Sequence, residues 1–139
     1  MRVVVDASNL VSGGGKTHLI QFLENLPPTQ QSLDFIILGA HSLESLLPNR
    51  SFIKFVPVDS YRSRLFSFVL WQFYYVHKIC QEFSADLLLV PGGIYLGSFR
   101  PFVSMCQNMA PFTPHLFLMY LWPITSINRI FKLLLAHLF

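Results

Sequence analysis

The sequence VVVDASNLVSGGGKTH, residues 3–18, gives the strongest indication of the fold. Its three consecutive valines favour a short strand that is buried on both faces of a sheet. A turn-rich stretch over residues 7–15 follows, and then a helical pattern from about residue 16 to residue 26, which Pro27-Pro28 stops. A strand, a glycine-rich turn and a helix in this order are typical of the first unit of an open parallel sheet.

The segments that follow repeat this alternation. Short apolar strands are expected at residues 35–38, 52–58, 87–90 and 102–106, with helices at residues 42–47 and 61–83. We therefore predict an α/β fold in which one domain, residues 1–114, forms a Rossmann-like parallel sheet with helices on both faces.

Composition and charge favour a folded domain followed by an apolar tail. Hydrophobic residues make up 53% of the chain and charged residues only 12%, which argues against disorder. In the tail, residues 115–139, the fixed charges are Arg129 and Lys132. We expect this tail to be helical and either to lie in a membrane interface or to dock on an absent second domain. No cluster of Lys and Arg is present, so nucleic acid is not an expected partner.

The cysteines and histidines point to a reducing compartment and to no metal. Cys80 and Cys106 both lie in apolar runs, and we expect them to be buried free thiols. The histidines are scattered without the spacing of metal ligands, so no metal cofactor is implied. The chain opens without the pattern of a signal peptide. We expect a cytoplasmic protein that the tail can bring to the inner face of the membrane.

The glycine loop is the sharpest chemical signal. Gly13, Gly14 and Gly15 let the backbone approach a ligand closely and take conformations that other residues avoid. The free N–H groups of the helix that follows can hold a phosphate, and the first turn adds three candidate ligand contacts, Lys16, Thr17 and His18. A turn without a ligand is the alternative.

Two familiar nucleotide-binding motifs do not fit this loop. A Walker A motif needs a glycine five residues before Gly15, and that position holds Leu10. The dinucleotide fingerprint also fails, because its third glycine, counted from Gly13, falls at His18. A second glycine pair, Gly92-Gly93, follows the strand expected at residues 87–90 and is predicted to lie at the same edge of the sheet, with a simple turn as the alternative.

Three motifs taken in order resemble the N-terminal domain of glycosyltransferase family 4. They are Asp6-Ala7-Ser8, then Ser12-Gly13-Gly14-Gly15-Lys16-Thr17-His18-Leu19, and later Val103-Ser104-Met105-Cys106-Gln107-Asn108-Met109-Ala110-Pro111-Phe112. The family is similar to the retaining GT-B enzymes, in which two Rossmann-like domains face a cleft. The resemblance implies that this domain binds the acceptor and that the glycine loop lies near the diphosphate of the donor.

The resemblance also implies a cleft position for Gln107 and Asn108. Many relatives have a histidine here, whereas Asn108 can orient a hydroxyl but cannot act as a base near neutral pH. A turn residue ahead of Pro111 is the alternative reading of Asn108. No catalytic residue is assigned.

The function implied is the acceptor-side half of a glycosyltransferase. It would act in glycan or polysaccharide assembly on a nucleotide-sugar and on a glycan or lipid-linked acceptor, and it would be inactive without a C-terminal donor domain or a partner subunit. The nucleotide-sugar is a substrate, so no cofactor is implied. A non-catalytic α/β binding module, or a subunit of a split transferase, is the alternative. A small peripheral membrane protein with an empty glycine loop is a third possibility.

Overall fold

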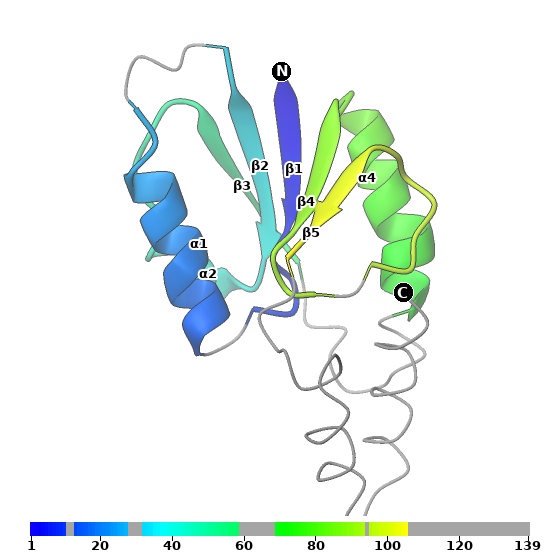
Figure 1. Cartoon of the computed structure of the whole chain (residues 1–139), viewed down its shortest axis with the longest axis horizontal. Coiled ribbons are helices and arrows are strands. Elements are labelled where there is room, and N and C mark those ends of the chain that lie inside the picture. The colour runs from blue at the N-terminus through cyan, green and yellow to red at the C-terminus, as the bar shows by residue number, and fades with distance from the viewer. Residues whose placement is uncertain (11–12, 28–31, 59–68, 94, 106–139) are drawn as a thin grey trace, which may run out of the picture.

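In the part of the chain that the structure describes, five parallel strands form one sheet (Figure 1). The computed structural model describes residues 1–10, 13–27, 32–58, 69–93 and 95–105. The strands are β1 (Arg2–Asp6), β2 (Asp34–Gly39), β3 (Ile53–Pro57), β4 (Leu87–Val90) and β5 (Phe102–Ser104). Their spatial order is β3-β2-β1-β4-β5, the order of Rossmann-like sheets. After β3 the chain returns to the other side of β1, so the topological switch point lies between β1 and β4.

Each face of the sheet is covered by helices. α1 (Gly14–Glu24) and α2 (His41–Glu44) cover one face, while the π-helical segment η2 (Trp71–Val76) and α4 (His77–Glu82), which continues it, cover the other. Figure 1 shows α1 and α2 on one side of the strands and α4 on the opposite side. This two-sided covering explains why the interior strands β1, β2 and β4 contain continuous apolar runs.

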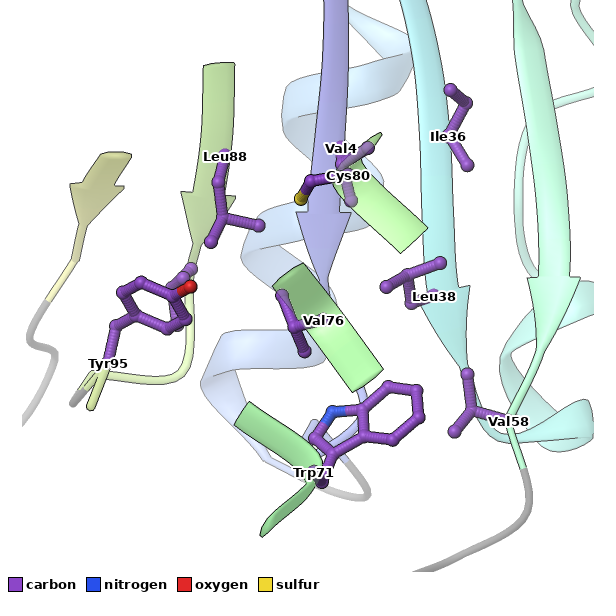
Figure 2. Close-up of a cluster of buried hydrophobic side chains, with 10 residues drawn as sticks. Val4, Ile36, Leu38, Val58, Trp71, Val76, Cys80, Leu88 and Tyr95 are labelled. Atoms are coloured by element: carbon purple, nitrogen blue, oxygen red, sulfur yellow. The ribbon is translucent and has the colours of Figure 1, made fainter. Parts of the chain in front are cut away.

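Alternate side chains of β1 enter two separate cores. Val3 and Val5 pack with Leu19 and Leu23 of α1, because successive side chains along a strand point to opposite faces. Val4 enters the other core, which Figure 2 shows, with the following buried residues: Ile36, Leu38, Val58, Trp71, Val76, Cys80, Leu88, Val90 and Tyr95.

The structure confirms the predicted α/β class, the parallel sheet and the helices on both faces. β4 has the predicted bounds, whereas α1 begins at Gly14 and ends at Glu24, two residues before the predicted position at each end. α2 is shorter than predicted because the chain leaves the helix at Ser45. The π-helical geometry of η2 was not predicted. Residues 59–68, the domain boundary at residue 114 and the tail lie outside the described residues.

Cys80 is a buried free thiol, as predicted, and Cys106 lies outside the described residues. Burial raises the pKa of the Cys80 thiol to about 12, and the negative charge of Asp6 adds to this effect. A thiol that stays protonated at neutral pH is a poor nucleophile and a poor metal ligand. Cys80 is therefore a packing residue of the second core.

In the described part of the chain, none of the helices has the length and apolar character that crossing a membrane requires.

We expect Leu23→Ala to lower the free energy of unfolding by about 2–5 kcal/mol, because it leaves a cavity between α1 and the sheet. Leu23 is 0% exposed, whereas Leu46, a matched control after α2, is 46% exposed. Leu46→Ala should cost less than about 1 kcal/mol. Urea unfolding followed by circular dichroism measures both changes. Equal effects of the two substitutions would contradict the assignment of Leu23 to the core.

Candidate functional site

The candidate site lies at the carboxyl edge of the sheet, beside the switch point. In open α/β sheets, ligands bind outside the carboxyl ends of the strands at the point where the strand order reverses. The segments that leave β1 and β4 meet here, and α1 begins at the same edge (Figure 1). The glycine loop and the Gly92-Gly93 pair therefore share one edge, as the sequence predicted.

Gly13 and Gly14 differ in their backbone roles. Gly13 is the N-cap of α1 and has φ 86° and ψ −167°, a combination that is essentially restricted to glycine. Gly14 is the first residue of the helix, and its φ lies outside the left-handed region. In the described part of this glycine run, the positive φ belongs to Gly13.

The space beside these two glycines is open. A Cβ atom built on Gly13 or on Gly14 meets no heavy atom within 4 Å. Glycine at position 14 is therefore required neither by the backbone angles nor by packing against the described residues, and it leaves the helix start uncovered.

Among the described residues, nothing neutralises the start of α1. No side chain in this part of the chain caps the helix through a hydrogen bond, and its first turn holds no acidic residue. The N–H groups of a first helical turn lack partners within the helix and carry a partial positive charge. An anionic group such as a phosphate is the ligand that this end of a helix favours.

The other predicted site residues divide into two groups. Thr17 and His18 are exposed on α1, while Lys16 is half-buried and its Nζ lies 3.5 Å from the carbonyl oxygen of Ser42. Lys16 thus reaches toward α2. Gln107 and Asn108, the predicted cleft residues, lie outside the described residues.

Asp6 is a buried carboxyl at the end of β1. Its Oδ1 accepts hydrogen bonds from Ser8 Oγ at 2.6 Å, from Ser8 N at 3.2 Å and from Trp71 Nε1 at 3.4 Å. Burial raises the pKa of Asp6, and these hydrogen bonds oppose the shift. The hydrogen bond to Trp71 connects the end of β1 to the start of η2, which lies on the opposite face of the sheet from α1.

Asn9 joins the segment after β1 to the segment after β4. Its Nδ2 donates a hydrogen bond to the carbonyl oxygen of Gly92 at 3.2 Å. Gly93 has a positive φ of 106°, and its carbonyl oxygen accepts a hydrogen bond from Ser104 Oγ of β5. Asn9 does not stand out in the sequence, because asparagine is common in turn-rich stretches. The signal that could have found it is its position just after the first strand of a parallel sheet, where ligands bind.

Within residues 1–105, outside the gaps given above, no three His, Cys, Asp or Glu side chains gather as a metal site requires.

We expect the stability of the protein to depend on the protonation of Asp6. The pKa of this carboxyl is raised above 3.8 in the folded state, chiefly by burial, so the folded state holds the proton more tightly than the unfolded chain. The resulting stability is complete below 3.8 and is lost as the pH rises through the folded pKa. Asp6→Asn should therefore be more stable than the wild type at neutral pH and should lose this advantage in acid.

Urea unfolding at a series of pH values measures this dependence. Ser8→Ala is the matched variant, because the Ser8 hydroxyl lowers the pKa of Asp6. Its removal should shift the loss of stability to higher pH. A pH profile that Asp6→Asn leaves unchanged would show that Asp6 does not titrate as described.

The two glycines should respond in opposite ways to alanine. Gly13→Ala should lower the free energy of unfolding by about 1–3 kcal/mol, because its backbone angles are unfavourable for any residue with a Cβ. Gly14→Ala should leave it unchanged or raise it by up to about 1 kcal/mol, since alanine favours a helix more than glycine does. Thermal unfolding of both variants tests this, and a large loss at Gly14 would show that position 14 is restricted by the fold.

Comparison with known proteins identifies no relative: no protein-family model, curated protein or solved structure matches this chain.

Proposed function

We propose that this chain is the acceptor-side half of a glycosyltransferase, which transfers a sugar from a nucleotide-sugar donor in glycan or polysaccharide assembly. The observation that carries the proposal is the open, uncapped helix start at Gly13-Gly14, next to the switch point of a parallel sheet. A phosphate of the donor would be held by the N–H groups of this turn.

A bound ligand explains the glycine loop better than a simple turn does. A turn needs glycine where φ is positive, which accounts for Gly13. It does not account for Gly14, whose missing side chain leaves open space. A glycine without a conformational or packing reason is what close approach of a ligand to the backbone requires.

The donor's remaining contacts would come from a second domain or from a partner subunit. Among the described residues, the carboxyl edge offers one buried carboxyl, Asp6, already hydrogen-bonded by Ser8 and Trp71. The chain would therefore bind substrate without completing the transfer. The proposed setting is the cytoplasm, with peripheral contact at the inner face of a membrane where a lipid-linked acceptor would be presented.

The experiment is a titration of the full chain with UDP, GDP, UDP-glucose and GDP-mannose, followed by amide NMR. At least one of these should shift the resonances of residues 13–15. Gly14→Val should weaken that binding by at least about tenfold, or about 1.4 kcal/mol, because a branched side chain fills the open space beside the helix start.

Two controls accompany this titration. Gly14→Ala adds a single methyl group and should weaken binding less than Gly14→Val, while the circular dichroism of both variants stays that of the wild type. Incubation of the chain with labelled nucleotide-sugars and lipid acceptors should give no transfer. Unchanged binding by Gly14→Val would refute the role of the loop, and robust transfer by the chain alone would refute the need for a second half.

A further inference from the structure

The carboxamide of Asn9 carries an acceptor that the protein does not use. Its Nδ2 faces the carbonyl oxygen of Gly92, which can only accept, so the donor end of the amide is fixed toward Gly92. Its Oδ1 is buried and has no hydrogen-bond partner, alone among the buried side-chain nitrogen and oxygen atoms of the described residues. Native proteins rarely leave a buried acceptor unpaired, because the lost hydration is not replaced.

Packing against Gly92 holds the Asn9 carboxamide in place. A Cβ atom on Gly92 would lie 2.1 Å from both Nδ2 and Oδ1 and 2.3 Å from Cγ. The amide therefore lies directly against the Gly92 backbone, and glycine is the residue that leaves room for it. The neighbouring Gly93 is held from the other side by Ser104. The position of the acceptor is thus fixed before a ligand binds, and a ligand reaches the buried Oδ1 when the atoms that cover it move aside.

The chemistry of this acceptor selects a hydrogen-bond donor and disfavours an anion. An amide oxygen accepts hydrogen bonds from O–H and N–H groups, whereas it repels phosphate oxygens. A phosphate is favoured instead at the start of α1, four residues further along the chain at Gly13. Asn9 therefore suits the hydroxyl groups of a phosphorylated sugar, and the start of α1 suits its phosphate.

On the basis of the proposed function, we infer that Asn9 Oδ1 accepts a hydrogen bond from a hydroxyl group of the carbohydrate ligand. The hydroxyl belongs either to a hexose or to the ribose of the nucleotide, and both offer the same donor chemistry. Asn9 and Gly92 together then form a hydroxyl-binding subsite at the switch point, beside the phosphate end of the glycine loop.

The test follows the side-chain amide resonances of Asn9 in the full chain. The probes are methyl glycosides of glucose, mannose and galactose, which carry only hexose hydroxyls, and ribose 5-phosphate, which carries ribose hydroxyls and no base. We expect one of the two kinds of probe to shift the Asn9 signals, and this identifies the source of the hydroxyl. Asn9→Ala should then weaken the binding of that probe by roughly tenfold.

Stability separates a binding role from a structural one. Removal of an unpaired buried acceptor should leave the Tm of Asn9→Ala unchanged or raise it, whereas a merely structural asparagine would lower the Tm and leave the titration unaffected. Asn25→Ala is the matched control, since Asn25 Nδ2 donates to the carbonyl oxygen of Gln21 at the other end of α1. It should change neither the affinity nor the Asn9 signals.

A second variant tests the subsite without removing its acceptor. Gly92→Ala should displace the Asn9 carboxamide and weaken probe binding by a similar factor. The double variant that combines Asn9→Ala with Gly92→Ala should bind the probe no more weakly than either single variant. Probes that shift residues 13–15, with unchanged affinity in Asn9→Ala, would overturn the subsite and leave the proposed function standing. If no probe shifts any resonance, both fail.

Discussion

The burial of β1 between two neighbouring strands holds the sheet, its two helical layers and the candidate site in place. β1 pairs in parallel with β2 and with β4, and Val4 and Val5 are 0% exposed. A strand in this position has no free edge, so its backbone groups are satisfied only when both neighbours are in register. Because Val4 and Val5 point to opposite faces, a helical layer is needed on each side. The loops that follow β1 and β4 are thereby brought to one edge.

Much of this fold is predictable because its signals are local. β4 is a run of four apolar residues between Asp86 and Pro91, and such sharp limits leave little choice of boundary. η2 is different, since an apolar helical pattern does not distinguish α from π geometry. Gln72 of η2 is 0% exposed, which no local pattern indicates. Its Oε1 accepts a hydrogen bond from Leu96 N, so a contact 24 residues away allows its burial.

The candidate site, like the fold, has features that the sequence predicts and features that it does not. Topology alone is enough to predict that the glycine loop lies at the carboxyl edge, because strand ends in a parallel sheet point in one direction. The contact between Asn9 and Gly92 joins residues 83 positions apart, and neither residue type is unusual in its own turn. The uncovered surface at Gly14 is likewise a property of the folded molecule. What the sequence conveys is therefore the position of the site, while its hydrogen bonds arise from tertiary contacts.

The pairing of β1 with β4 also determines the order in which the molecule can be assembled. The hydrogen bond from Arg2 N to the Asp86 carboxylate spans 84 residues, so one flank of β1 must wait until most of the described chain has been synthesised. At about 5–20 residues per second, this wait lasts roughly 4–17 s. During it, β1 and β2 can associate, but the backbone N–H and C=O groups on the other edge of β1 stay unpaired. Long-range parallel pairing of this kind folds slowly and exposes the nascent chain to aggregation, so the first strand of the sequence is enclosed only when the fourth strand reaches it.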